Sequence, residues 1–319
     1  MTIRTAFRFA ALAISALTIG LGSAKAQEFP SQPITFVVPY APGGISDILG
    51  RAVSASLQQQ LGQPVVVVNK PSPGIVLGLS EVANAKPDGY TIGIWSNAAY
   101  VFPIAMKQQV PYDGVEGFTF LRSYGEFVVG AVVAANSPYK TFQDLVDAGK
   151  KDPGKLKYGS IGVNSGQHLQ LEAAARHFGA KFVHIPQTGT AANISNVLGG
   201  HLDFLSDASS WTPNVKQGQM RLLAISGTKR NPYFPDVPTY KELGVQEEYW
   251  GRGAIVAAAG IPADVRGKLE TALDKAFQDP KVQEAVSSIA QAITSIPGAD
   301  MTEWAKSDRE FWKKSLASN

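Results

Sequence analysis

The chain has 319 residues, of which 45% are hydrophobic and none is cysteine. This length is sufficient for a sizeable core, and the composition excludes disulfide bonds, thiolate catalysis and cysteine metal ligands. The formal charge is +3, from 29 basic and 26 acidic residues, but residues 1–26 hold three of the basic residues and no acid. The remainder is therefore close to neutral, which leaves nucleic-acid binding without electrostatic support.

Residues 1–26 have the pattern of a secretory signal peptide. Arg4 and Arg8 precede an apolar run over 9–21, and Ala24-Lys25-Ala26 is a small-x-small cleavage pattern. The alternative is a membrane anchor, but the run is short and rich in Ala, Ser and Gly for a bilayer span. We therefore expect export to the periplasm, with Gln27 as the first mature residue of a soluble protein.

The next segment predicts a strand, a glycine turn and a helix. Apolar residues at 34–38 are typical of a covered parallel strand, and the Pro-Gly-Gly sequence at 42–44 ends that run. Ser46 and Asp47 are typical of a helix start, and apolar residues then recur at helical spacing up to Leu61. Free backbone N–H groups at such a turn, together with the helix dipole, form a small anion site.

Strand and helix patterns alternate along the rest of the chain. Strands are predicted over 65–68, 90–95, 127–134, 156–160, 181–185, 202–205, 222–225 and 249–257. Helices are predicted over 77–85, 141–149, 166–178, 191–198, 265–277, 281–289 and 302–316. This alternation predicts an α/β fold with parallel sheets covered by helices on both faces.

The length of the mature chain favours two lobes over one. The chain is expected to cross between them near 124–127 and to return near 246–250. Lobe 1 would then comprise residues 27–125 and 247–319, and lobe 2 residues 126–246.

Two further loops repeat the strand–turn–helix pattern. The first carries Ser160 and then Ser165 and Gly166, and the second carries Thr188, Gly189 and Thr190. One such loop is weak evidence, because these turns are common in α/β proteins that bind nothing. Three of them at the carboxyl ends of strands from two lobes predict an interlobe cleft that suits a carboxylate.

Three longer segments carry a further signal: residues 33–47, Gly62-Gln63-Pro64 with the Val run and Asn69-Lys70-Pro71 that follow, and Lys86-Pro87-Asp88-Gly89-Tyr90-Thr91. These segments resemble the Bug family, the periplasmic solute-binding proteins of tripartite tricarboxylate transporters. Residues 158–172, 198–204 and 235–239 fit the same pattern. Together these motifs cover essentially the whole mature chain and are highly specific.

The resemblance implies a two-lobed type II periplasmic binding fold that closes on its ligand. It implies capture of a carboxylate between the loop at 42–47 and the loops at 160–168 and 188–191, followed by delivery to an integral-membrane permease. Asp207 stands where the family usually has an acid facing the cleft.

The sequence departs from the family pattern in two places. Residues 72–76 replace a glycine-rich run, and residues 95–100 replace a stretch of small hydroxyl residues with a histidine. Trp95, with Tyr40, Tyr100 and Phe102, could form a platform for an aromatic ring, and the alternative is ordinary core packing. This interpretation predicts a mono- or dicarboxylate with apolar or aromatic bulk.

Arg252 and the four histidines need separate consideration. Arg252 could grip a second carboxylate with two parallel hydrogen bonds, and the alternative is a solvated residue at a strand edge. His168 lies on a predicted site loop, whereas His177, His184 and His201 are interpreted as structural or surface residues. Together, the loops and the resemblance predict a ligand site formed by Tyr40, Pro42, Gly43, Gly44, Ile45, Asp47, Trp95, Ser96, Asn97, Ser160, Ser165, Gly166, His168, Thr188, Gly189, Thr190, Asp207 and Arg252.

The leading interpretation is a monomeric binding protein without catalysis, cofactor or metal, with a small carboxylate and a membrane permease as its partners. An enzyme on the same fold is an alternative, but the sequence shows no nucleophile elbow, phosphate-loop lysine or metal-ligand spacing. A receptor that passes its ligand state to a signalling partner is a second alternative. The effector lobe of a transcription regulator is disfavoured by the signal peptide.

Overall fold

The computed structural model describes residues 28–317, except for Thr188, Thr228, Glu247, Glu248, Trp250, Ile289, Gln291 and Ala292. The predicted signal peptide and Gln27 therefore lie outside the described residues, as do Thr188 and Trp250. Of the described residues, 28–31 belong to a separate unit, and the compact unit begins at Gln32. The description below concerns this compact unit.

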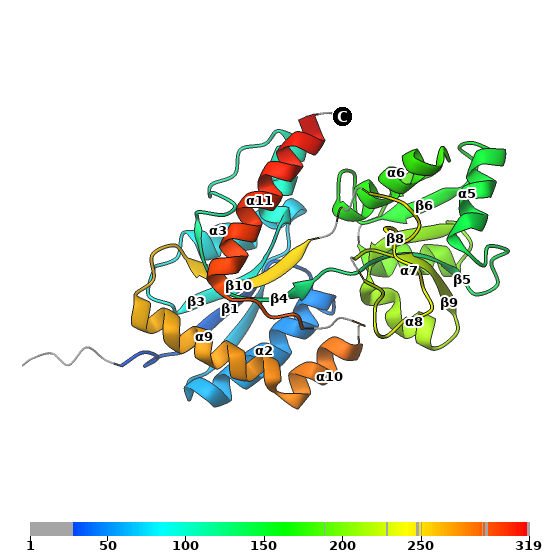
Figure 1. Ribbon diagram of the computed structural model, residues 1–319. Helices are drawn as coiled ribbons and strands as arrows, with labels where there is room; N and C mark the ends of the chain where they lie inside the picture. Colours follow the sequence, from blue (N-terminus) through cyan, green and yellow to red (C-terminus); the bar gives the residue numbers. More distant parts are fainter. Residues whose placement is uncertain are drawn as a thin grey trace, which may run out of the picture. The chain divides into compact units, whose positions relative to one another are not determined.

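The first sheet has five strands in the order β2-β1-β3-β10-β4 (Figure 1). Its strands are β1 (Ile34–Val38), β2 (Val65–Asn69), β3 (Thr91–Ser96), β4 (Phe118–Glu126) and β10 (Arg252–Ala258). β1 is parallel to β2 and β3, while β10 is antiparallel to both β3 and β4. β4 therefore runs in the direction of β1 and β3, and the three strands end at one edge of the sheet.

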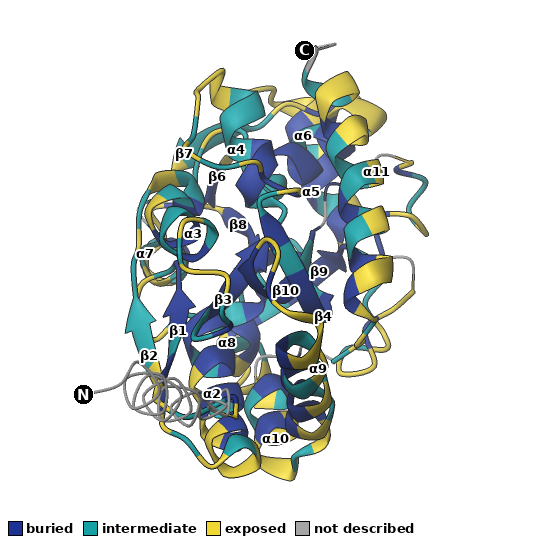
Figure 2. Cartoon of the chain, turned by 90° about the vertical axis from the view of Figure 1, so that its left-hand side faces the viewer, coloured by how far each residue is buried: buried dark blue, intermediate teal, exposed yellow. Residues whose placement is uncertain are grey.

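Helices cover this sheet, as the alternating pattern predicts. They are α2 (Ile45–Leu61), α3 (Val76–Ala83), α4 (Ala98–Met106), α9 (Ala263–Gln278), α10 (Pro280–Ser288) and α11 (Gly298–Ala317), with the short 3-10 turn η1 (Pro73–Ile75). The central strands are buried along most of their length, whereas α2, α9, α10 and α11 expose one side (Figure 2). These helices bury the apolar residues that recur at helical spacing in the sequence.

The second sheet has the order β7-β6-β8-β5-β9. Its strands are β5 (Val129–Ala134), β6 (Lys157–Ser160), β7 (Val183–Pro186), β8 (Phe204–Ala208) and β9 (Met220–Ile225). The associated helices are α5 (Phe142–Lys151), α6 (Gly166–Phe178), α7 (Thr190–Leu198), α8 (Thr212–Lys216) and the 3-10 turn η2 (Ser209–Trp211). β6 is parallel to β7 and β8, and β5 is antiparallel to β8 and β9.

The chain passes between the two sheets twice, after Glu126 and before Arg252, and we call these two connections the crossing segments. The register of each sheet shows which of its edges lies beside them. The chain leaves the first sheet at Glu126, the edge at which β1 and β3 also end. In the second sheet Val129, the first residue of β5, pairs with Ala208, the last residue of β8. The returning segment is tied to the outgoing one, because the Phe127 N–H donates to the Gly251 carbonyl at 2.8 Å. The loops that follow the parallel strands of both sheets therefore lie at the edges beside the crossing segments.

Two elements near this edge are not predicted by the sequence patterns. β4 combines apolar residues with Arg122 and Ser123, which interrupts a strand signal, and α4 contains Pro103. The strand expected over 127–134 begins only at Val129, because the two residues before it belong to the crossing segment. The last helix starts at Gly298, four residues earlier than the apolar periodicity predicts.

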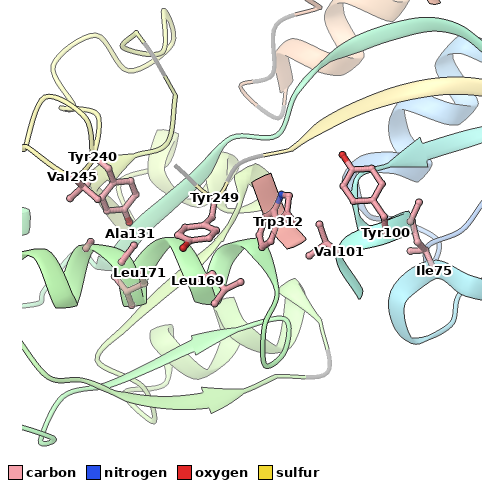
Figure 3. Packing of buried hydrophobic residues seen from close by; sticks show 14 of the residues in the cluster. Ile75, Tyr100, Val101, Ala131, Leu169, Leu171, Tyr240, Val245, Tyr249 and Trp312 are labelled. Carbon is pink, nitrogen blue, oxygen red and sulfur yellow. The ribbon is translucent and has the colours of Figure 1, made fainter. Parts of the chain in front are cut away.

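The core contains several aromatic residues. Trp95, Trp211, Trp312 and Tyr240 are among the largest fully buried side chains. Figure 3 shows Tyr249, in the returning segment, beside Trp312 of α11, and their ring centroids are 5.2 Å apart. This packing joins the returning segment to α11. Among the described residues, no helix combines the length and apolar character needed to cross a membrane.

Candidate functional site

The loop after β1 is held in place from below by Asp47. The Asp47 carboxylate accepts hydrogen bonds from the Gly43 N–H at 2.9 Å, from Arg51 Nε at 3.0 Å and from Asn69 Nδ2 at 2.9 Å. Asn69 Nδ2 also donates to the Tyr40 carbonyl at 3.1 Å. One carboxylate thus joins the start of α2, the end of β2 and the loop between β1 and α2.

These contacts assign Asp47 a different role from the predicted one. Burial alone would raise the pKa of Asp47, but the hydrogen bonds from Arg51, Gly43 and Asn69 together lower it. The side chain is almost completely buried and its oxygens face the loop backbone and the Arg51 guanidinium. We therefore correct the expectation that Asp47 contacts ligand: in this structure it positions the loop that would do so.

The outer part of the same loop remains accessible. Pro42 and Gly43 are exposed, and Gly44 and Ile45 are partly exposed. Gly44 is the N-cap of α2 and no side chain caps this helix end. Gly43 has φ +82°, a left-handed conformation that favours glycine and lets the chain turn above the strand. The start of α2 is therefore accessible, and its backbone N–H groups have the chemistry that suits an anion.

The ends of β1 and β3 are joined by two hydroxyl groups. The Tyr40 hydroxyl and Ser96 Oγ lie 2.9 Å apart. Burial raises the pKa of Tyr40, and the Ser96 hydrogen bond opposes this shift only in part, so the phenol is neutral at physiological pH. The structure thus brings these two predicted site residues together at the edge of the first sheet.

The structure contradicts the predicted role of Trp95. Its side chain is fully buried, its Nε1 donates to the Gly114 carbonyl at 2.9 Å, and its ring packs edge-on against Phe120 with centroids 4.8 Å apart. Successive residues of a strand point to opposite faces, so Ser96 and Trp95 cannot share one surface. Trp95 is a core residue and offers no surface on which an aromatic ligand could stack.

Asn97 and Tyr100 also have partners within the protein. Asn97 Nδ2 and the Tyr100 hydroxyl both donate to Oδ2 of Asp308 on α11, at 3.2 and 2.6 Å. Burial raises the pKa of Asp308 to about 6, against the effect of these hydrogen bonds. Asn97 therefore connects the end of β3 to the last helix, and Tyr100 is excluded from the expected aromatic platform.

Arg252 is neither a free carboxylate clamp nor a solvated residue. Its guanidinium donates to Glu126 on the neighbouring strand β4 and lies over the Trp304 ring, 5.9 Å from the ring centroid. Because its charge already faces a carboxylate of the protein, the structure does not support the predicted grip on a second ligand carboxylate.

In the second lobe, the loop after β6 is organised by two serines. The Ser165 hydroxyl donates to the Gly162 carbonyl at 2.8 Å and accepts from the His168 N–H at 3.2 Å, which caps α6. Ser160 is fully buried at the end of β6, and its Oγ lies 3.5 Å from Ser165 Oγ. Gly166 is partly exposed at the start of the helix. Ser160 thus supports the loop from beneath.

Two histidines lie behind this loop, and sequence reasoning missed one of them. His184 Nε2 is 2.8 Å from Ser160 Oγ, and the His184 and His168 ring centroids are 4.1 Å apart. His168 Nδ1 accepts a hydrogen bond from the Asn164 N–H at 3.1 Å. Burial lowers the pKa of both rings, that of His184 to about 4 with the help of neighbouring His168, so both are neutral at pH 7. Only the pairing of β6 with β7 brings His184 here.

The loop after β7 leads into α7, whose N-cap is Gly189, and no described side chain caps this helix start. Thr190 Oγ1 donates to Asp207 Oδ1 at 3.2 Å, and Asn193 Nδ2 donates to Asp207 Oδ2 at 2.7 Å. Asp207 is fully buried at the end of β8, and burial raises its pKa to about 6. Like Asp47, it positions a helix start and does not itself face solvent, which corrects the role that the family resemblance implies.

The two lobes therefore carry similar half-sites. Each presents a helix, α2 or α7, whose start is not capped by any described side chain, and each has a buried aspartate that holds this helix start in place. The loops at 39–46, 160–167 and 187–191 contain no lysine or arginine. Such loops can hold an anion through backbone N–H groups and hydroxyls. Among the described residues, no cluster of three or more His, Asp or Glu side chains is arranged to hold a metal ion.

The chain forms two α/β lobes, and in each the loops after the parallel strands lie at the sheet edge beside the crossing segments. This is the two-lobed fold of periplasmic solute-binding proteins. Residues 49–312 match the sequence pattern described as "Tripartite tricarboxylate transporter family receptor", TctC. The "UPF0065 protein in gbd 5'region" of Cupriavidus necator is 37% identical over 280 residues, which cover 86% of this chain and 85% of that protein. The chain belongs to this receptor family, which includes the Bug proteins, and the predicted resemblance is confirmed.

Solved structures agree with this assignment. A protein described as a periplasmic transporter is 31% identical with a TM-score of 0.82, and the match covers 91% of this chain and 97% of that one. The periplasmic binding protein BugD is 26% identical with a TM-score of 0.79, covering 91% and 98%. An R. palustris protein solved with adipate shares the fold at 24% identity, with a TM-score of 0.83 over 91% and 98% of the two chains. The family's members are solute-binding receptors rather than enzymes.

Proposed function

We propose that this protein captures a small carboxylate in the periplasm, between the half-sites of its two lobes, and delivers it to the permease of a tripartite transporter. One observation carries the proposal. Two helices, α2 and α7, begin at glycine N-caps at the sheet edges that adjoin the crossing segments, and no side chain among the described residues caps either helix. Uncapped N–H groups and the helix dipole favour an anion at both points.

The chemistry of the loops favours binding of that anion by uncharged groups of the protein. Both histidines near the second half-site are neutral at pH 7, and Arg252 faces Glu126. Backbone N–H groups, hydroxyls and bridging water molecules would then contact the carboxylate, as is common at wet binding sites. Asp47 and Asp207 hold the two helix starts, so that these N–H groups keep their direction.

The remaining surface of the loops supports an aliphatic ligand over an aromatic one. Ile161 and Val163, on the loop between β6 and α6, are 41% and 59% exposed. These exposed side chains offer an aliphatic surface beside the second half-site, whereas Trp95 is buried in the core of the first lobe. The R. palustris protein of the same fold was solved with adipate, a dicarboxylate with an aliphatic chain. A mono- or dicarboxylate with aliphatic bulk is therefore the ligand class we propose.

A thermal-shift and calorimetric screen of residues 27–319 tests this proposal. The panel should contain aliphatic mono- and dicarboxylates of increasing length, aromatic acids, and the diamide of each diacid as a matched uncharged control. We expect aliphatic acids to raise the melting temperature by mass action and the diamides to have no effect. If no carboxylate raises the melting temperature, or if the diamides act equally well, the proposal is wrong.

Delivery to a permease is tested separately in cells. Deletion of the gene should abolish uptake of the acid found in the screen, and the intact gene should restore it. If uptake persists while induction of genes for that acid is lost, the protein serves a signalling partner and the delivery step is refuted.

A further inference from the structure

Tyr124 occupies an irregular position in β4, close to the first half-site. In the pairing of β4 with β10, Gly125 stands opposite Gly253 and Ser123 stands opposite Ala254. Tyr124 is therefore an extra residue without a partner in the register, as in a β-bulge. Bulges turn a side chain away from its regular direction and are common beside functional sites.

The neighbouring strand makes room for the redirected side chain. A Cβ atom added to Gly253 would lie 2.0 Å from the Tyr124 hydroxyl oxygen and 1.9 Å from the ring carbon that bears it. The end of the Tyr124 ring thus occupies the place of a Gly253 side chain. Any larger residue at position 253 would displace the Tyr124 ring, so this position requires glycine.

This place lies directly beside Ser96. Gly253 and Ser96 are paired in the antiparallel ladder of β10 and β3. Side chains of such a pair point to the same face, with Cβ atoms about 5 Å apart. Ser96 in turn shares a hydrogen bond with Tyr40. Three hydroxyl groups, from β4, β3 and the loop after β1, therefore gather at the sheet edge beneath the first half-site.

Two of these hydroxyls satisfy each other, and the third has no partner among the described residues. The Tyr124 side chain is only 2% exposed, and its hydroxyl oxygen is buried without a hydrogen bond. Burial, together with the Tyr40 phenol nearby, raises the pKa of Tyr124 well above its ordinary value, so the group remains a neutral donor. A buried hydroxyl without a partner is unfavourable, so its persistence calls for a partner in another state of the protein.

We propose that the Tyr124 hydroxyl donates a hydrogen bond to an acceptor oxygen of the bound carboxylate ligand, directly or through one water molecule, and so selects ligands with a further oxygenated group. This inference rests on the proposed function. The uncapped start of α2 supplies N–H donors for one carboxylate. The Tyr124 hydroxyl would therefore donate to a different oxygen of the ligand, which belongs to a second carboxylate, a carbonyl or a hydroxyl group.

Tyr124→Phe tests this role, with Tyr240→Phe as a matched control. The Tyr240 hydroxyl is also buried without a partner among the described residues, but it lies in the second lobe, where its ring packs edge-on against Phe142 with centroids 5.3 Å apart. Both substitutions remove one unpartnered hydroxyl. Neither should lower the melting temperature of the ligand-free protein.

The two variants should differ when ligand is added. For the best diacid of the screen, we expect Tyr124→Phe to weaken binding about tenfold or more, as for the loss of one hydrogen bond to a charged group. The matching monocarboxylate, in which a methyl group replaces the second carboxylate, should bind Tyr124→Phe and the unaltered protein with equal affinity. Tyr240→Phe should bind every acid as the unaltered protein does.

Two results would overturn the inference. One is equal affinity of Tyr124→Phe and the unaltered protein for every acid with a second oxygenated group. The other is a melting temperature of ligand-free Tyr124→Phe several degrees lower than that of Tyr240→Phe, because the hydroxyl would then have a partner inside the protein. A failure of the unaltered protein to bind any carboxylate would instead refute the proposed function, so the two failures are distinguishable.

Discussion

Asp207, at the end of β8, holds Thr190, the first residue of α7, through a hydrogen bond of 3.2 Å between Thr190 Oγ1 and Asp207 Oδ1. The carboxylate is fully buried, and Asn193 and the Ala208 N–H also donate to it. Asp207, which the sequence analysis assigns to the ligand site, thus stabilises the start of α7. The same relationship recurs in the first lobe between Asp47 and Gly43.

The burial of Asp207 predicts a pH-dependent stability. Its pKa is raised to about 6 in the folded protein, above the ordinary 3.8, so folding is favoured by protonation. This stability contribution is complete below about pH 4 and is lost as the pH rises through 6. Between pH 7.5 and 5, the free energy of unfolding should rise by about 1 kcal/mol from this residue.

Urea unfolding of the unaltered protein and of Asp207→Asn at both pH values measures this effect. The difference between the two proteins should change by that amount, because Asp308, which also titrates near pH 6, contributes equally to both. The Asn193 Oδ1 atom, buried without a partner among the described residues, could accept from the new amide. A pH-independent difference would contradict the prediction.

Filling the open start of α2 should separate stability from ligand binding. Gly44→Asp places a carboxylate at the N-cap, where it can accept from the free N–H groups, and a Cβ at this position meets only the Ala41 carbonyl at 3.6 Å. We expect the ligand-free protein to gain about 0.3–1 kcal/mol and the affinity for carboxylates to fall at least tenfold. Gly44→Ala is the control and should retain most of the affinity. Undiminished binding by Gly44→Asp would exclude α2 from the site.

Removal of the Asp47 carboxylate should loosen the first loop. Asp47→Ala leaves the Gly43 N–H without its acceptor and removes one of the two acceptors of Asn69 Nδ2, which should cost about 2 kcal/mol of stability and weaken ligand binding. Asp144→Ala is the matched control, since Asp144 also accepts backbone N–H groups at a helix start, as the capping box of α5. It should lower the melting temperature by less than Asp47→Ala does, because Asp144 is exposed, and it should leave the affinity unchanged. Equal affinities of the two variants would argue against the positioning role.

Because the pKa of Asp47 is lowered, its contribution has the opposite pH dependence to that of Asp207. The contribution is present above the ordinary pKa of 3.8 and is lost as the pH falls below it. Acid unfolding of Asp47→Ala should therefore be less steep than that of the unaltered protein.

Trp95→Phe distinguishes the core from a ligand platform. Loss of the Nε1 hydrogen bond to Gly114 and of ring volume should lower the free energy of unfolding by about 1–3 kcal/mol. The affinity of the folded variant for its best ligand should stay within twofold of the unaltered value. A large loss of affinity at unchanged stability would support the prediction that Trp95 forms a platform for the ligand.

Two of the four histidines in the second lobe, His168 and His184, should have pKa values below the ordinary range. We expect the ring signals of His184 in an NMR titration to change near pH 4, because burial and His168 disfavour its protonation. The neutral ring stabilises the fold above the ordinary pKa of 6.5, and this contribution is lost as the pH falls through 4. Titration of His184 near 6.5 would show a solvated ring and contradict the contact with Ser160.

The fold was largely accessible from local patterns. Strands such as β1 and β5 bury both faces and therefore appear as continuous apolar runs, while α6 and α9 show apolar residues at helical spacing. β4 and α4 escaped prediction because Arg122 and Pro103 interrupt those signals. Their positions depend on pairing with β10 and packing against α11, which are distant in the sequence.

The candidate site was predicted at the level of its loops and less well at the level of side chains. Ser165 caps α6 as expected, and α2 and α7 begin at the predicted glycine turns, although their N-caps are Gly44 and Gly189 and not the residues expected to start the helices. Turns and caps can be predicted because they depend on a few neighbouring positions of the chain. Trp95 and Arg252 were assigned to the ligand, but strand pairing directs one into the core and the other toward Glu126. His184 reaches Ser160, and Tyr124 reaches the Ser96 side of the sheet, through register alone.

The sequence by itself determined the alternation of strands and helices, the glycine and serine turns that start α2, α6 and α7, and the family of the protein. These features depend on residues close together in the chain. Only the tertiary structure decided which polar groups face each other, because hydrogen bonds such as Asp47 with Asn69 and Asp207 with Asn193 join separate elements. The direction of a side chain at a sheet edge follows from register and bulges, and these are set by long-range pairing.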